Sequence, residues 1–145
     1  KKGFVYNKEE DLLEGEFNGE DVFIGIETQK GKVWAVGVGY NSYFNAASLK
    51  INYEKLCRQF RDNPKYIVFS EDTLPDSKDL NYEVSVNKQS YNAIYIQNPQ
   101  FNESDWNRRV VVSFGPIETE NHPIGYYMLT IGYINGFNQA NGEDL

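Results

Sequence analysis

The chain has 145 residues, a formal net charge of −7 and a pI of about 4.7, and 15% of its residues are aromatic. The length suits one domain, so we expect residues 1–145 to fold as a single unit with residues 135–145 as a loosely ordered tail. The acidic balance argues against a molecule-wide basic face, so nucleic acid is not an expected partner. No apolar run approaches the roughly 20 residues of a membrane span.

Cys57 and His122 are the only cysteine and the only histidine. One thiol forms no internal disulfide, and the two side chains cannot supply the three or four ligands of a zinc site. We therefore expect no metal or other cofactor, a buried Cys57 and a His122 that serves in a turn. The run Gly37–Ser42 starts like a dinucleotide-binding fingerprint, but it lacks the third glycine and the following helix. No catalytic motif is present, and we expect a protein that is not an enzyme.

The first half of the chain predicts three strands. Residues 3–6 form a short apolar run, and the acidic segment 8–21 predicts a helical turn followed by a loop. The runs Val22–Thr28 and Val33–Gly39 are rich in β-branched residues, and a connection containing glycine separates them. They predict a β-hairpin closed by residues 29–32.

One amphipathic helix is expected near residues 53–61. Its apolar residues recur at i, i+3, i+4 and i+7, which places them on one helix face. They are Tyr53, Leu56, Cys57 and Phe60. Asn52 is the expected N-cap, and Pro64 ends the helix because the residue before proline disfavours helical angles. Residues 40–48 predict a loop.

The second half predicts almost only strands and loops. Strands are expected at 66–69, 82–86, 93–96, 109–114 and 126–134, with loops at 71–81 and 97–107. The alternation at 82–86 predicts a hairpin with 93–96. About eight short strands and one helix indicate a mainly β, β-rich α+β fold. Its expected form is an antiparallel sandwich or a partly open barrel.

Two segments, 40–45 and 101–107, combine aromatic rings with amide and carboxyl groups, a mixture typical of surfaces that bind proteins or sugars. The candidate partner-binding residues are Tyr40, Asn41, Tyr43, Asn102, Asp105 and Trp106. The alternative is that rings of these segments pack into the core at the base of each loop. The leading functional hypothesis is a non-enzymatic binding domain for a protein or glycan partner.

Seven acids within residues 8–21 form a candidate acidic surface: Glu9, Glu10, Asp11, Glu14, Glu16, Glu20 and Asp21. A solvated face, a calcium site without EF-hand spacing and a docking surface for a basic partner all remain open. The last interpretation gives a second hypothesis, an acidic inhibitor or immunity-type protein that neutralises a basic toxin or enzyme. A third is an assembly subunit of a surface structure or virion. The first residue is Lys1 rather than Met, which slightly favours a processed secreted, periplasmic or surface protein.

Overall fold

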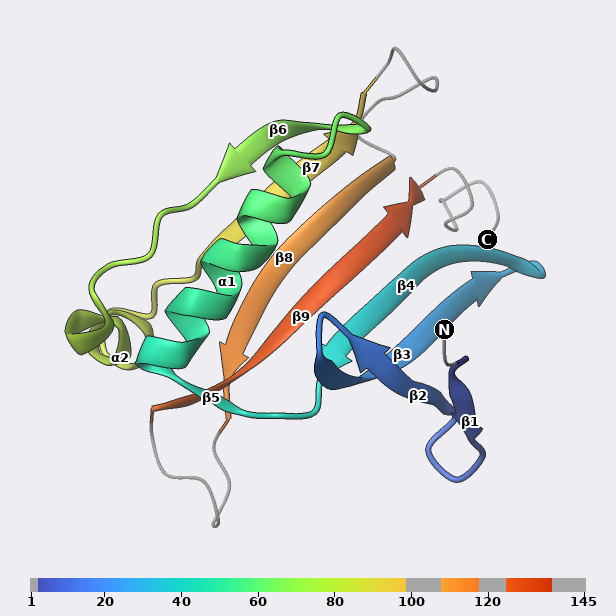
Figure 1. Cartoon of the computed structure of the whole chain (residues 1–145), viewed down its shortest axis with the longest axis horizontal. Coiled ribbons are helices and arrows are strands. Elements are labelled where there is room, and N and C mark those ends of the chain that lie inside the picture. The colour runs from blue at the N-terminus through green and yellow to red at the C-terminus, as the bar shows by residue number, and fades with distance from the viewer. Residues whose placement is uncertain (1–2, 99–107, 118–124, 137–145) are drawn as a thin grey trace.

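The computed structural model describes residues 3–98, 108–117 and 125–136. In chain order its elements are β1 (Val5–Asn7), β2 (Leu12–Phe17), β3 (Glu20–Gln29), β4 (Lys32–Tyr40), β5 (Phe44–Asn45), α1 (Ala46–Arg61), β6 (Tyr66–Glu71), α2 (Ser77–Ser85), β7 (Asn92–Gln97), β8 (Arg108–Pro116) and β9 (Tyr126–Asn135). All nine strands belong to one sheet in the order β1-β2-β3-β4-β9-β8-β7-β6, with β5 paired to β9 (Figure 1). Every pairing is antiparallel and the sheet is not closed. The predicted β-rich α+β class is therefore confirmed.

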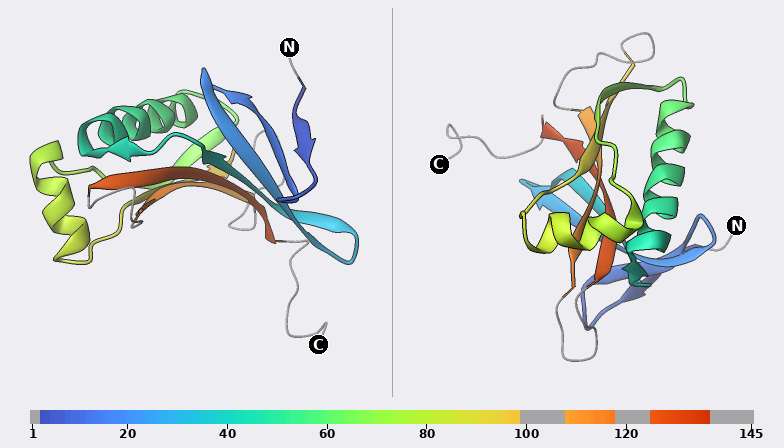
Figure 2. Two further views of the ribbon diagram at one scale, coloured as in Figure 1. Left: turned by 90° about the horizontal axis from the view of Figure 1, so that it is seen from below. Right: turned by 90° about the vertical axis from the view of Figure 1, so that its left-hand side faces the viewer.

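Helix α1 lies along one face of the sheet, where it contacts β5, β6, β7, β8 and β9, and α2 packs against α1. Figure 2 shows the β2–β3 end of the sheet curling toward the side that carries α1. Asn18 in the β2–β3 turn donates a hydrogen bond to Gln59 of α1 at 2.9 Å and so ties this end to the helix. Within the described ranges, neither helix is long and apolar enough to cross a membrane.

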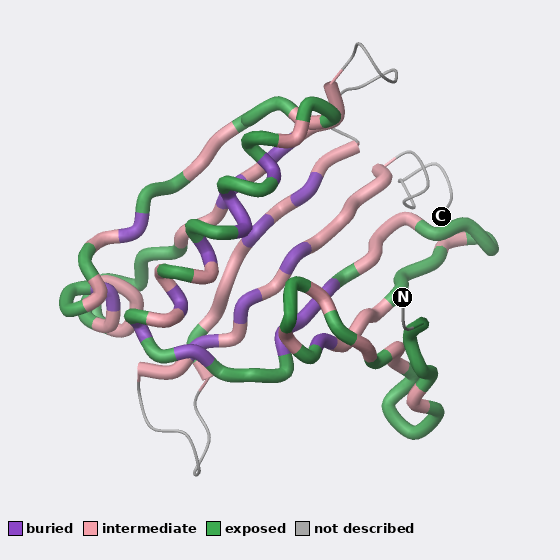
Figure 3. Tube along the Cα trace, viewed as in Figure 1, coloured by how far each residue is buried: buried purple, intermediate pink, exposed green. Residues whose placement is uncertain are grey.

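The core lies between α1 and the strand residues that face it. Strand side chains alternate between the two faces of a sheet, and the buried residues of β8 and β9 fall at alternate positions in the middle of β8 and the first half of β9. Val112, Leu129 and Ile131 are fully buried there, as is Leu49 of α1 (Figure 3). This layer holds the helix against the half of the sheet formed by β6 to β9.

The predicted helix is correct in its apolar face but wrong in its start. Helix α1 begins at Ala46, and the side chain of Asn45 accepts a hydrogen bond from the backbone N–H of Ser48 at 2.9 Å. Asn52, the predicted cap, lies inside the helix and donates to the Ser48 carbonyl. Part of the predicted 40–48 loop is therefore strand β5 and the first helical turn.

The strand predicted at 82–86 is wrong, because Ser77–Ser85 form helix α2. Leu80 is fully buried and Val84, four residues later, packs on the same core, which is helical spacing. Tertiary contact with α1 thus overrides a short alternating pattern. The predicted 82–96 hairpin does not form, and β7 pairs instead with β6 and β8.

The segment predicted as a helical turn and a loop contains strand β2. Leu13 and Phe17 are half-buried, while Glu14 and Glu16 are exposed, so the residues alternate as in a strand. Asn18 and Gly19 have φ values of +54° and +80°, a left-handed turn that suits this pair and closes a β2–β3 hairpin. The predicted β3–β4 hairpin is confirmed, with its turn at Lys30 and Gly31.

Candidate functional site

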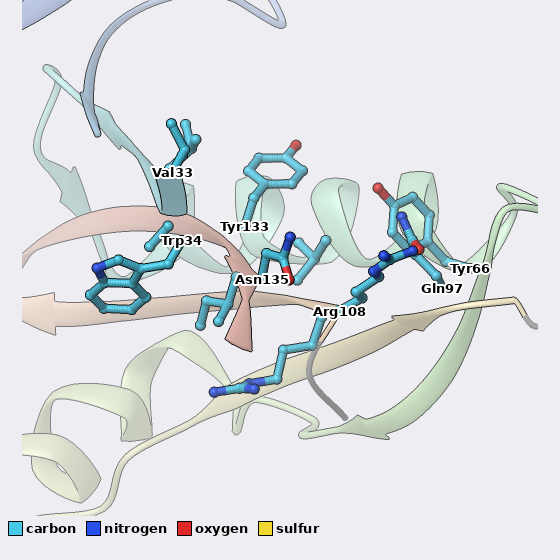
Figure 4. Close-up of a pocket in the computed structure, with 12 residues that line it drawn as sticks. Val33, Trp34, Tyr66, Gln97, Arg108, Tyr133 and Asn135 are labelled. Atoms are coloured by element: carbon cyan, nitrogen blue, oxygen red, sulfur yellow. The ribbon is translucent and has the colours of Figure 1, made fainter. Parts of the chain in front are cut away.

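A cavity of about 330 Å³ opens at the end of the sheet where α1 ends (Figure 4). In an antiparallel sheet the starts of β4, β6 and β8 meet the ends of β7 and β9, so residues remote in sequence gather here. The described lining residues are Val33, Trp34, Ala35, Val36, Tyr66, Gln97, Arg108, Arg109, Val110, Tyr133, Ile134 and Asn135. The volume falls at the lower end of the roughly 300–1,000 Å³ typical of small-molecule sites.

The tyrosines of this cavity are held by the last turn of α1. The ring of Phe60 meets Tyr66 edge-on with centroids 5.3 Å apart and contacts Tyr133 at 6.2 Å. It also stacks on the buried Tyr95 at 5.3 Å. Aromatic pairs of this kind contribute about 0.5–1.5 kcal/mol beyond simple burial. The cluster therefore positions Tyr66 and Tyr133 and stabilises the junction of helix and sheet.

Three polar groups of the lining make no hydrogen bond to another described residue. The side-chain oxygen Oε1 of Gln97 is buried and has no partner. The hydroxyls of Tyr66 and Tyr133 also have none, and burial raises the pKa of both groups. For Tyr133, burial and the proximity of Tyr66 and Tyr40 raise the pKa to about 12. Both phenols are therefore neutral near pH 7, and each is able to donate and accept a hydrogen bond.

Figure 4 shows the Arg108 side chain directed toward Gln97 and Tyr66, so a cation lies beside these groups. Trp34 stands on the other side of the cavity at an irregularity of β4. Thr28 pairs with Val33 and Glu27 pairs with Ala35, so Trp34 is the extra residue of a β-bulge. Bulges redirect side chains and are frequent beside functional sites. The arrangement thus surrounds a hollow with rings, an amide and a guanidinium.

The structure describes three of the six sequence-predicted binding residues. Tyr40 is the last residue of β4, is 2% exposed and packs edge-on against Phe44 at 5.7 Å, so its assignment as an exposed loop ring is wrong. Asn41 and Tyr43 beside it are exposed. Asn102, Asp105 and Trp106 lie outside the described residues, in the segment that connects β7 to β8.

The described residues on either side of the 101–107 segment lie far from the 40–45 segment. Strand β4 has nine residues, and at about 3.3 Å per residue its ends are roughly 30 Å apart. Asn41 follows the C-terminal end of β4, whereas Gln97 and Arg108, the described residues that flank the other loop, line the cavity at its N-terminal end. The described residues that flank the two loops therefore lie at opposite ends of β4.

The predicted acidic surface lies on the β1–β2 turn and the β2–β3 hairpin. All of its members are exposed except Glu20, which is half-buried. Glu14, Glu16 and Asp21 share one face of the hairpin, and Glu16 lies directly opposite Asp21 in the strand pairing. Across residues 3–98, 108–117 and 125–136, no group of three or more Asp, Glu, His or Cys side chains is arranged to hold a metal ion.

A second polar cluster ties β6 and β7 to α1. Glu71 accepts a hydrogen bond from the Tyr95 hydroxyl at 2.6 Å and forms an ion pair with Arg61 at 2.6 Å. Burial alone would raise the pKa of Glu71, but the bonds from Arg61 and Tyr95 and the guanidinium charge lower it overall. Cys57 is 2% exposed beside this cluster, and burial raises the pKa of its thiol. Cys57 is thus the buried core residue expected from the sequence.

The cavity was missed in the sequence because its residues come from five separate segments. Within one segment, the run from Val33 to Val36 supplies four of these residues, and Trp34 is the residue that bulges from the β3–β4 pairing. Comparison of the chain with family models, with curated proteins and with solved structures finds no match.

Proposed function

We propose that this protein is a non-enzymatic binding domain that engages a protein or glycan partner through the cavity beside α1. The observation that carries the proposal is the convergence of Tyr66, Gln97 and Tyr133 on one hollow without hydrogen-bond partners among the described residues. A buried oxygen without a partner costs about 1–3 kcal/mol, a cost that a bound ligand removes. Aromatic walls with a few polar groups are typical of such sites.

The experiment compares capture by two forms of the protein. The wild type is immobilised and incubated separately with a glycan library and with protein extracts, and bound species are identified. The pocket variant Tyr66→Phe/Gln97→Met/Tyr133→Phe keeps the rings and the volume but removes the three polar groups. We expect a species bound by the wild type to be lost by this variant. Tyr82→Phe, at an exposed position of α2, is the matched control and should bind normally.

Two results would contradict the proposal. The first is an unchanged set of captured species in the pocket variant, which would place binding elsewhere. The second is a wild type that captures nothing from either source. Nucleic acid is not an expected partner, because the net charge of −7 opposes binding to phosphates.

A second candidate is an acidic inhibitor of a basic toxin or enzyme, and one observation favours it. Glu16 and Asp21 are like charges placed directly opposite each other, an arrangement that destabilises a strand pair. Neither they nor Glu14 forms an ion pair with a described residue. A basic partner would neutralise this face and would be steered to it by charge.

The test of this candidate is the salt dependence of association with a captured basic partner. Capture by charge predicts an association rate that falls steeply as ionic strength rises, and a further fall in the variant Glu14→Gln/Glu16→Gln. A rate that does not depend on salt would exclude the acidic face as the docking surface.

A further inference from the structure

We infer that the cavity binds a neutral, hydroxyl-rich ring, the glycosyl unit of a glycan, through the Tyr66 and Tyr133 hydroxyls and the Gln97 side-chain oxygen. This inference rests on the proposed binding function and names the chemical class of the ligand. It starts from the hydrogen-bonding capacity that the cavity presents. Two neutral phenols each donate and accept, while the amide oxygen of Gln97 only accepts.

A sugar hydroxyl also donates and accepts, so the hydroxyls of a sugar ring match the hydrogen-bonding capacity of each of the three groups. The buried Gln97 oxygen requires a donor, which excludes an ionised carboxylate as the group bound at that atom. The faces of a sugar ring carry C–H groups that pack on aromatic rings. Tyr66, Tyr133 and Trp34 provide such rings around the same hollow (Figure 4).

The position of the cavity disfavours an extended peptide as the ligand. Peptides that add to a sheet pair their backbone with an exposed edge strand. The lining comes mainly from β4, β7, β8 and β9, and each of these strands already has a neighbour on both sides. The backbone groups of these strands are therefore already paired with neighbouring strands, and the ligand must be recognised by side chains. A compact ring suits a hollow of about 330 Å³ better than an extended strand does.

The unpaired Gln97 oxygen also predicts the stability of a variant of the ligand-free protein. An unpaired buried oxygen is unfavourable, whereas an apolar group of the same shape avoids its desolvation cost. Gln97→Met should therefore leave the ligand-free protein as stable as the wild type or more stable. The same substitution should weaken binding of the glycosyl unit by about tenfold, since one hydrogen bond is lost. A residue that only supports the fold would not show this combination.

The experiment is a titration of the ¹⁵N-labelled full chain with the methyl glycosides of glucose, galactose, mannose and N-acetylglucosamine, followed by NMR. Concentrations reach roughly 20 mM, because single sugar units are expected to bind with dissociation constants near 1 mM. We expect at least one glycoside to shift the Gln97 side-chain and Trp34 indole signals saturably. Gln97→Met and Tyr133→Phe should each weaken this binding about tenfold, and Tyr82→Phe should not.

The inference is overturned if no glycoside shifts these signals, if shifts occur only away from the cavity, or if Gln97→Met binds as well as the wild type. A Gln97→Met protein that melts well below the wild type also overturns it, because the oxygen would then be satisfied in the folded chain. The binding function is judged separately. If the capture experiment yields a protein that the pocket variant loses, the glycan inference fails and the proposed function stands. If nothing depends on the cavity, both fail.

Discussion

The buried hydroxyl of Tyr95 offers a sharp test of how α1 is fixed to the sheet beside the cavity. The Tyr95 ring is fully buried, and its hydroxyl donates to Glu71 at 2.6 Å and lies 3.2 Å from the Cys57 carbonyl. Tyr95→Phe keeps the ring and removes one hydrogen bond to a carboxylate, a bond worth about 1.5–3 kcal/mol. Because Glu71 keeps Arg61 and partial contact with water, we expect a loss of about 2 kcal/mol in the free energy of unfolding.

The assay is urea unfolding at pH 7 and at a series of acid pH values below 4.5, with the exposed Tyr82→Phe as control. The folded-state pKa of Glu71 is lower than its ordinary value of 4.5, so its stabilisation is present above that value. The stabilisation is lost as the pH falls through the lower folded-state pKa. The deficit of Tyr95→Phe should therefore shrink as the pH falls through that folded-state pKa, because the bond then joins two uncharged groups. A deficit below about 0.5 kcal/mol at pH 7, or a deficit that stays the same throughout the acid series, would refute the reasoning.

Two further predictions concern the sheet outside the cavity. A Cβ at Gly39 would lie 2.3 Å from the Phe23 ring, whereas a Cβ at Gly37 meets nothing within 4 Å. Gly39→Ala should therefore lower the free energy of unfolding by about 1–3 kcal/mol, and Gly37→Ala, its matched control, should change it little in urea unfolding; equal effects would contradict the packing. Glu16→Lys replaces the repulsion between residue 16 and Asp21 by attraction, and should raise the free energy of unfolding by up to about 1 kcal/mol at low salt but not at high salt. A gain that persists at high salt would show another cause.

The sequence predicts the fold class because its strongest patterns are long. The runs in β3, β4, β8 and β9 hold enough β-branched and apolar residues to identify them as strands, and Gly31 marks a turn between two of them. The α1 stripe has a clear helical period over two turns. These elements depend on local preference and on one buried face, both of which are visible along the chain.

The errors occur where short patterns fit two structures. The alternation Tyr82–Val86 suits a strand, but Leu80 and Val84 are also spaced for one face of a helix, and contact with α1 selects the helix. In the acidic segment 8–21, the many charged residues obscured the strand alternation from Leu13 to Phe17, where exposed glutamates separate half-buried residues. The turn pair Asn18–Gly19 was the local signal for that hairpin.

The candidate site was not predictable from local patterns, because strand order alone brings its residues together. Tyr66, Gln97 and Tyr133 are 31 or more residues apart along the chain, and each is unremarkable in its own segment. The predicted binding loop at 40–45 was plausible by composition. The structure instead buries Tyr40 in the core, because it ends a strand whose alternate residues Val38 and Tyr40 are buried and its ring packs against Phe44.

The most direct test of the binding site is hydroxyl-radical footprinting of the wild-type protein with and without its captured partner. Aromatic side chains are readily oxidised, and the chain carries them both at the cavity and on the acidic hairpin. The account predicts that the partner protects Trp34, Tyr66 and Tyr133, while the exposed Tyr6 and Tyr82 remain as reactive as in the free protein. Protection of Tyr6 with unchanged reactivity at the cavity would contradict the account and would place the partner on the acidic surface, where the Tyr6 hydroxyl donates to Asp11.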